Sequence, residues 1–125
     1  MIQGIGTDVV QIDRMEKSLA SPAFWRRVFG PQERQWLEHL APSRQKQSAA
    51  ANFAAKEAFL KAIGTGIGGF ELGEIQVLRQ PSGAPCFALL GQAAQWAQEQ
   101  KVQAHLSLAH DGGIAQAFVI LERQD

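Results

Sequence analysis

In the first half of the chain, the spacing of apolar residues is first that of a β-strand and then that of α-helices. The segment from Ile2 to Val10 is predicted to be a strand that ends near Asp8, where the chain turns. Apolar residues then recur at helical spacing, and a long, almost wholly apolar helix is predicted from about Gln45 to Ile63. Three short helices bounded by serine, glycine and proline are predicted between them, over residues 13–20, 22–29 and 31–40.

The second half is dominated by strand-like alternation. Residues 74–78 and 86–90 are predicted strands on either side of a turn that ends at Pro85. A helix is expected over residues 92–100, and two final strands, 105–109 and 115–121, flank a turn at 111–113. Paired hairpins favour a small antiparallel sheet packed with helices. The pattern therefore predicts an α+β fold, with residues 1–125 as a single domain.

The long helix carries charges where an apolar helix rarely has them. Glu57 and Lys61 are four residues apart and lie on one helical face. Such charges are usually paired, or bind a metal or a ligand. Glu57 together with Asp8, from the first strand, makes a carboxylate pair suited to Mg²⁺. Two simpler readings stay open here: Asp8 as a turn residue, and Glu57 as the ion-pair partner of Lys61.

Glycines follow this helix directly. The sequence Gly64-Thr65-Gly66 comes after a helix, so it is neither a P-loop nor a dinucleotide-binding turn, both of which precede one. Gly64 suits a helix C-cap. The further glycines exceed what a cap needs and favour close approach of backbone amides to an anionic ligand.

Composition narrows the function classes. The 125 residues carry zero net charge, which argues against generic nucleic-acid binding, and no apolar run is long enough to cross a membrane. The first residues do not resemble a secretory signal. The single cysteine, Cys86, excludes an internal disulfide and favours a reducing compartment, so we expect a cytoplasmic protein.

The segment from Asp13 to Lys46 contains seven basic residues and four acidic ones. This local excess of positive charge indicates either solvated helix faces or a docking surface for an acidic partner.

One histidine stands at a strand-to-turn boundary. His110 follows a predicted strand and precedes Asp111 and Gly112. A lone histidine is more often structural than catalytic, but this position also suits a site residue.

Three blocks of the chain resemble one family. They are residues 4–14 (GIGTDVVQIDR), 53–66 (FAAKEAFLKAIGTG) and 106–111 (LSLAHD), and the turn from Gly83 to Pro85 matches as well. Their order and spacing are similar to those of the AcpS-type 4′-phosphopantetheinyl transferases, the holo-(acyl-carrier-protein) synthases. The resemblance implies that fold over nearly the whole chain.

The resemblance also implies an activity: transfer of 4′-phosphopantetheine from coenzyme A to a serine of apo-acyl carrier protein, with adenosine 3′,5′-bisphosphate as the other product. It implies Mg²⁺, or alternatively Mn²⁺, held by Asp8 and Glu57, and catalysis by Glu57, Lys61 and His110. Glu57 is the first choice for the base that takes the serine proton and His110 the second. Expected coenzyme-binding residues are Lys61, Gly64, Thr65, Gly66, Pro85, Ser107 and His110.

The resemblance implies partners too. The carrier protein is acidic, and the expected docking residues are Arg14, Lys17, Arg26 and Arg27. A homotrimer with active sites between subunits is expected, with neither nucleic acid nor membrane as a partner.

Two positions depart from the family pattern. Asn52 stands where arginine is usual, which removes an expected cationic contact to the coenzyme that Arg44 or Lys46 would have to replace. Ala109 stands where a hydroxyl residue is common. The alternative function is a non-catalytic module that binds coenzyme A or carrier protein. A generic metal-dependent phosphohydrolase would need more acidic residues around the metal.

Overall fold

The computed structural model describes residues 1–64 and 70–125, and its elements follow the predicted α+β order. The strands pair antiparallel throughout, as expected. In chain order the elements are β1 (Ile2–Gln11), α1 (Ile12–Ser18), α2 (Pro22–Val28), α3 (Pro31–Glu38), α4 (Pro42–Ile63), the 3-10 helix η1 (Leu72–Glu74), β2 (Ile75–Arg79), β3 (Pro85–Leu89), α5 (Gly91–Gln100), β4 (Val102–Asp111) and β5 (Ile114–Arg123).

Several boundaries differ from the sequence prediction, and two of the differences have a clear physical reason. Strand β1 does not end near Asp8: it stays paired with β5 as far as Gln11, and Asp8 lies mid-strand opposite Ala117. The reading of Asp8 as a turn residue was therefore wrong. Helix α4 begins three residues earlier than predicted, because Pro42 suits the first helical position, where no backbone donor is needed.

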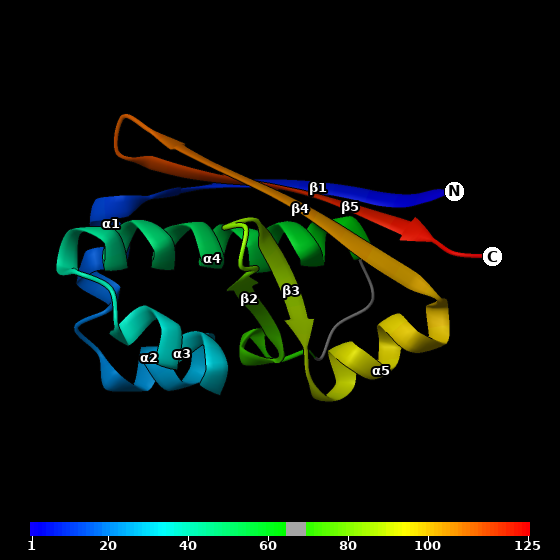
Figure 1. The fold of residues 1–125 in the computed structure, drawn as a ribbon, viewed down its shortest axis with the longest axis horizontal. Helices are drawn as coiled ribbons and strands as arrows, with labels where there is room; N and C mark the ends of the chain where they lie inside the picture. Colours follow the sequence, from blue (N-terminus) through cyan, green and yellow to red (C-terminus); the bar gives the residue numbers. More distant parts are fainter. Residues whose placement is uncertain (65–69) are drawn as a thin grey trace.

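The strands form two sheets. One has the order β1-β5-β4, and the other is the β2-β3 hairpin. Figure 1 shows the three-stranded sheet along one side of α4, with the hairpin and helices α2, α3 and α5 along the other. Helix α4 is therefore enclosed between two layers, which explains why so many of its residues from Ala49 onward are buried.

Strand β1 lies unusually close to α4 because both carry small residues. A Cβ added at Gly6 would lie 2.0 Å from the backbone oxygen of Ala58, and one added at Gly4 would lie 1.9 Å from that of Ala62. Ala58 and Ala62 are themselves buried. The strand therefore rests almost directly on the helix backbone, at a separation that side chains on β1 would not permit.

A buried ion pair ties α3 to α4. Lys56 Nζ lies 2.6 Å from Glu33 Oε1, and both side chains are fully buried. Burial raises the pKa of Glu33 and lowers the pKa of Lys56, while the attraction between the two charges opposes both shifts. The sequence had placed Glu33 among the surface charges between α1 and α4, and no role had been assigned to Lys56.

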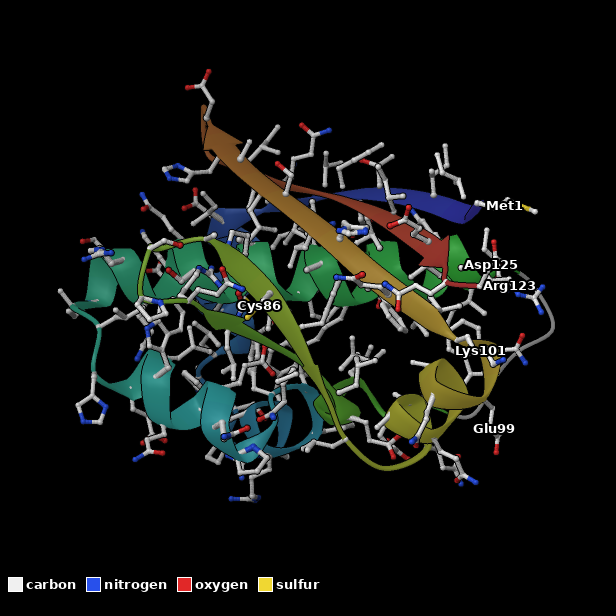
Figure 2. The ribbon with its side chains drawn as sticks, turned by 45° about the vertical axis from the view of Figure 1, so that its right-hand side comes forward. Met1, Cys86, Glu99, Lys101, Arg123 and Asp125 are labelled. Carbon is white, nitrogen blue, oxygen red and sulfur yellow. The ribbon has the colours of Figure 1, made fainter. Side chains whose placement is uncertain are left out.

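The two ends of the described chain meet at one end of the three-stranded sheet. Figure 2 shows Met1, Arg123 and Asp125 there, and the backbone N–H of Arg123 donates to Met1 O at 2.8 Å. Within residues 1–64 and 70–125, none of the helices combines the length and the apolar character needed to span a bilayer.

We expect Gly6→Ala to destabilise the protein by about 1–3 kcal/mol, because the new methyl group has to displace the backbone of α4. Urea unfolding followed by circular dichroism measures the change. Gly73→Ala is the matched control, since its added Cβ would meet its nearest neighbour at an ordinary 3.5 Å. Equal stability of the two variants would show that β1 and α4 are not held this close.

Candidate active site

Asp8 and Glu57 line one cavity of about 530 Å³. Asp8 comes from the middle of β1 and Glu57 from the second-last turn of α4, and the close packing of these two elements brings them to the same place. Arg14, on α1, lines the same cavity. The remaining wall is largely apolar: Val9, Val10, Met15, Phe24 and Phe53, with Gln11 and Ser18.

Lys61 joins this group through Asp8. Its Nζ lies 3.0 Å from Asp8 Oδ1 and donates to the backbone oxygen of Thr7 at 3.1 Å. The simple reading that Lys61 pairs with Glu57 was wrong: the ammonium group reaches across to β1 instead. The Lys61 side chain is 56% exposed, so it stays accessible to a ligand that approaches the carboxylates.

The two carboxylates repel each other. Partial burial raises the pKa of Glu57, the negative charge of Asp8 raises it further, and the Lys61 ammonium partly offsets both effects. Such a pair favours a bound cation, and carboxylate oxygen suits Mg²⁺ or Mn²⁺. Among the residues that the structure describes, three or more His, Cys, Asp or Glu side chains nowhere gather as a metal site. A cation held here would therefore take its other oxygens from water or from a ligand.

A second cavity, of about 260 Å³, is cationic. It is lined by Arg44 from the start of α4, Arg79 from the end of β2 and His110 from the end of β4. The Arg79 guanidinium lies 4.7 Å from the centre of the Trp36 ring, a cation–π contact that fixes its position. The turn residues Gly83 and Pro85, together with Gln47, Ser48, Ala51, Leu108 and Ala109, complete the wall.

This cavity has the character of an anion site. Burial lowers the pKa of Arg79, yet an arginine stays charged at neutral pH. Within the described residues, neither Arg44 nor Arg79 forms an ion pair with a carboxylate. Sequence reasoning had considered Arg44 but missed Arg79. The available signal was an arginine in a half-buried strand directly opposite Pro85 of the predicted turn.

The two cavities lie apart on one chain. They share none of their lining residues, and they open at opposite edges of the three-stranded sheet, one at β1 and the other at β4. The structure therefore brings Asp8, Glu57 and Lys61 together, and it places His110 with the cationic cavity instead. Pro85 also lies there.

The other predicted coenzyme residues have varied positions. Gly64 is the C-cap of α4, with a φ of 98° that favours glycine, so the capping prediction is confirmed. Thr65 and Gly66 lie outside the described residues. Ser107 is exposed on the outer face of the sheet, opposite Phe118.

Asn52 differs from the expectation based on the family pattern. The sequence suggested a lost contact at a ligand surface, but the side chain is fully buried. Its Nδ2 donates to Glu33 Oε2 at 3.0 Å and to the backbone oxygen of Val77 at 3.1 Å. In this chain position 52 therefore belongs to the interior, and the arginines that line the cationic cavity are Arg44 and Arg79.

The predicted docking residues are exposed on two helices. Arg14 and Lys17 lie on α1, and Arg26 and Arg27 lie on α2. Of the four, Arg14 shares the cavity of the carboxylate pair. Because Glu33 is buried against Lys56, the surface between Asp13 and Lys46 carries seven basic residues against three acidic ones.

Comparisons with known proteins agree with this architecture. A family model described as the 4′-phosphopantetheinyl transferase superfamily matches residues 4–119. A holo-(acyl-carrier-protein) synthase of Trichlorobacter lovleyi is 47% identical over 127 aligned residues that cover 98% of each chain. The synthase of Treponema denticola is 42% identical and covers 98% of this chain and 99% of its own.

Solved structures give the same result. The holo-(acyl-carrier-protein) synthase of Neisseria meningitidis superposes with a TM-score of 0.86 at 34% identity, covering 98% of this chain and 100% of its own. The synthase of Bacillus anthracis, solved in complex with CoA (3′,5′-ADP), gives a TM-score of 0.83 at 35% identity and covers 99% of both chains. The chain therefore belongs to the 4′-phosphopantetheinyl transferase superfamily and, within it, to the holo-(acyl-carrier-protein) synthases.

Proposed function

We propose that this protein transfers 4′-phosphopantetheine from coenzyme A to a serine hydroxyl of apo-acyl carrier protein, releasing adenosine 3′,5′-bisphosphate. The observation that carries the proposal is the meeting of Asp8, Glu57 and Lys61 at one cavity, in a chain of this family. Two carboxylates and an accessible ammonium group match the needs of a reaction at a pyrophosphate.

Asp8 and Glu57 would hold a divalent cation, with Mg²⁺ as the proposed metal and Mn²⁺ as a substitute. Their mutual repulsion and their oxygen donors fit such an ion. When bound, the ion supplies positive charge that neutralises pyrophosphate oxygens and the leaving phosphate.

The side chains divide the remaining work. The serine oxygen attacks the β-phosphorus of coenzyme A, the bond from that phosphorus to the bridging oxygen breaks, and adenosine 3′,5′-bisphosphate leaves with the bridging oxygen. Glu57 accepts the serine proton. Lys61 neutralises charge on the phosphate oxygens.

The cationic cavity suits the other end of the coenzyme. Arg44, Arg79 and His110 would bind the 3′-phosphate of the adenosine, while Pro85 offers an apolar surface to the base. We propose coenzyme contacts also for Ser107 and for the Gly64-Thr65-Gly66 turn. His110 then serves as a phosphate ligand rather than as the general base.

Separation of the two cavities supports an oligomer. One coenzyme has to reach both cavities, yet on one chain they open at opposite edges of the sheet. If the β1 edge of one protomer meets the β4 edge of the next, each site is completed by two chains. A head-to-tail contact of this kind closes into a ring, and we propose the homotrimer.

The outer face of the sheet offers an apolar surface beside the β1 edge. Side chains exposed by 42% to 62% project from β1 and β5: Ile2, Ile5, Val9, Ile114 and Phe118. An exposed apolar group of this kind is typical of an interface, and the proposed occupant is a second copy of the same chain.

Carrier-protein docking is proposed for the basic surface beside the catalytic cavity. Arg14 lines that cavity, and Lys17, Arg26 and Arg27 extend positive charge over α1 and α2. An acidic carrier would be steered there by charge. We place the reaction in the cytoplasm, in line with the single cysteine, Cys86, which is half-buried on β3 (Figure 2).

The direct test is incubation of the protein with apo-carrier protein, coenzyme A and Mg²⁺, followed by mass spectrometry of the carrier. We expect the carrier to gain the mass of one phosphopantetheine, and EDTA to prevent the gain. A carrier that binds but stays unmodified would instead identify a non-catalytic binding module.

Glu57→Gln is expected to lower kcat by about 100-fold or more, because the proton acceptor and a metal ligand are both lost.

The same substitution should also stabilise the metal-free protein at pH 7. Folding raises the pKa of Glu57 above 4.5, so its ionised form destabilises the fold increasingly as pH rises through the folded-state pKa.

Thermal unfolding in EDTA between pH 4 and pH 8 measures this stability difference, which should shrink toward acidic pH. Glu99→Gln, at an exposed position on α5, is the control and should lack the effect. A metal-free Glu57→Gln protein less stable than the wild type at pH 7 would contradict the account of carboxylate repulsion.

Arg14→Glu is expected to raise the KM for the carrier protein by about tenfold at low salt and by less at high salt, because screening weakens charge steering. Steady-state kinetics at two ionic strengths measure the effect. Arg123→Glu, at the far end of the sheet, is the charge-matched control. A change confined to the KM for coenzyme A would show that Arg14 does not contact the carrier.

A further inference from the structure

The buried polar cluster beneath α4 has no part in the chemistry described above. Lys56 donates its three protons to Glu33 Oε1 at 2.6 Å, Ile75 O at 2.7 Å and Leu72 O at 3.0 Å. These acceptors belong to α3, to η1 and to the first residue of β2, which directly follows η1. The ammonium group is therefore fully satisfied and held from three directions.

Asn52 binds the same carboxylate one helical turn earlier. Its Nδ2 reaches Glu33 Oε2 at 3.0 Å, while Glu33 Oε1 also accepts from the backbone N–H of Gly30 at 3.0 Å. Glu33, Asn52 and Lys56 are all fully buried, and we call them the buried clamp. Two residues of α4, four positions apart, are thus bonded to a single fixed side chain.

Each clamp residue of α4 is followed directly by a residue of the catalytic cavity. Phe53 follows Asn52, Glu57 follows Lys56, and both of these line the cavity that contains Asp8. Consecutive helical residues are about 100° apart around the helix axis. The clamp and the catalytic wall are therefore neighbouring faces of one helix, and fixing the first fixes the second.

Most other buried residues of α4 are alanines: Ala49, Ala50, Ala51, Ala54, Ala55, Ala58 and Ala62. Phe59 is the one large apolar side chain among its fully buried residues, and it packs against Phe87 and Trp96 after the clamp, toward the end of the helix. Small side chains leave shallow ridges, which restrain turning of a helix about its own axis poorly. At a side-chain radius of about 5–6 Å, a rotation of about 10° moves the Glu57 carboxylate by about 1 Å. A displacement of that size is enough to cost about 100-fold in rate.

We propose that Glu33, Asn52 and Lys56 are positioning residues, which set the rotation of α4 and thereby hold Glu57 opposite Asp8. The inference rests on the proposed function for its kinetic consequence. The choice of polar over apolar side chains supports it. A buried ion pair is seldom the most stabilising filling of a core, and here Asn52 Oδ1 lies buried with no hydrogen-bond partner among the described residues. The directional hydrogen bonds of this cluster, which orient α4, explain its polar side chains better than a gain in stability does.

The test compares Lys56→Met with the paired replacement Glu33→Leu/Lys56→Met. Three quantities are measured: thermal stability, Mn²⁺ affinity by electron paramagnetic resonance, and kcat with the KM for coenzyme A. Lys56→Met should be less stable, bind Mn²⁺ about 10–100-fold more weakly, and lose kcat by a similar factor. The KM for coenzyme A is a secondary readout, because Arg44, Gln47 and Ser48 of the same helix line the cationic cavity.

The paired replacement separates positioning from stability. Removing both charges should restore stability, since an apolar pair replaces a buried ion pair at little or no cost. Mn²⁺ affinity and kcat should stay low. Recovery of all three quantities would overturn the proposal. Leu121→Ala is the control: it lowers stability at a fully buried site on β5 and should leave Mn²⁺ affinity unchanged.

If the paired variant does not fold, Asn52→Ala provides a second test of the proposal. It removes two hydrogen bonds and the unpartnered oxygen, and alanine favours the helix. The expected result is a loss of stability of about 1–3 kcal/mol, smaller than that of Leu121→Ala, with weaker Mn²⁺ binding. Wild-type Mn²⁺ affinity would overturn the proposal. Mn²⁺ binding needs no turnover, so a wild-type protein that binds Mn²⁺ but transfers nothing would contradict the proposed function alone.

Discussion

The close contact between β1 and α4 is the constraint on which the site depends. Gly4 and Gly6 bring the strand onto the backbone of the helix at Ala58 and Ala62. Only at this separation do Asp8, in mid-strand, and Glu57, on the helix, line one cavity, with Lys61 bonded back to β1. This close packing also makes the two carboxylates repel each other, which destabilises the metal-free fold but favours a bound cation.

Different faces of helix α4 contribute to different parts of the molecule. One face carries Phe53 and Glu57 into the catalytic cavity, a second is bonded to Glu33, and the first turns reach the cationic cavity through Arg44 and Ser48. Because the sheet lies between the two cavities' openings, a single chain does not join them. The proposed trimer follows from this arrangement, since an adjacent protomer would supply the second cavity at the β1 edge.

Local patterns predicted most of the elements, and the motif around Glu57 predicted the carboxylate pair. The α+β order and antiparallel pairing were foreseeable because hairpins and helix caps are local signals. Long-range pairing was not: β1 extends to Gln11 because it pairs with β5, more than 100 residues away, and the five strands divide into two sheets. The roles of Glu33, Asn52 and Arg79 were missed for the same reason, since each depends on a partner from another element.

Subunit mixing tests the central claim, that α4 presents two half-sites that meet only between copies of the chain. Glu57→Gln protomers retain the cationic cavity, and protomers carrying Arg44→Glu with His110→Ala retain the carboxylate pair. Each variant alone should be nearly inactive in carrier-protein modification. The account predicts that co-refolding the two restores a substantial part of the activity, because some interfaces then combine two intact halves. Mixed assemblies that form but stay as inactive as the separate variants would contradict it.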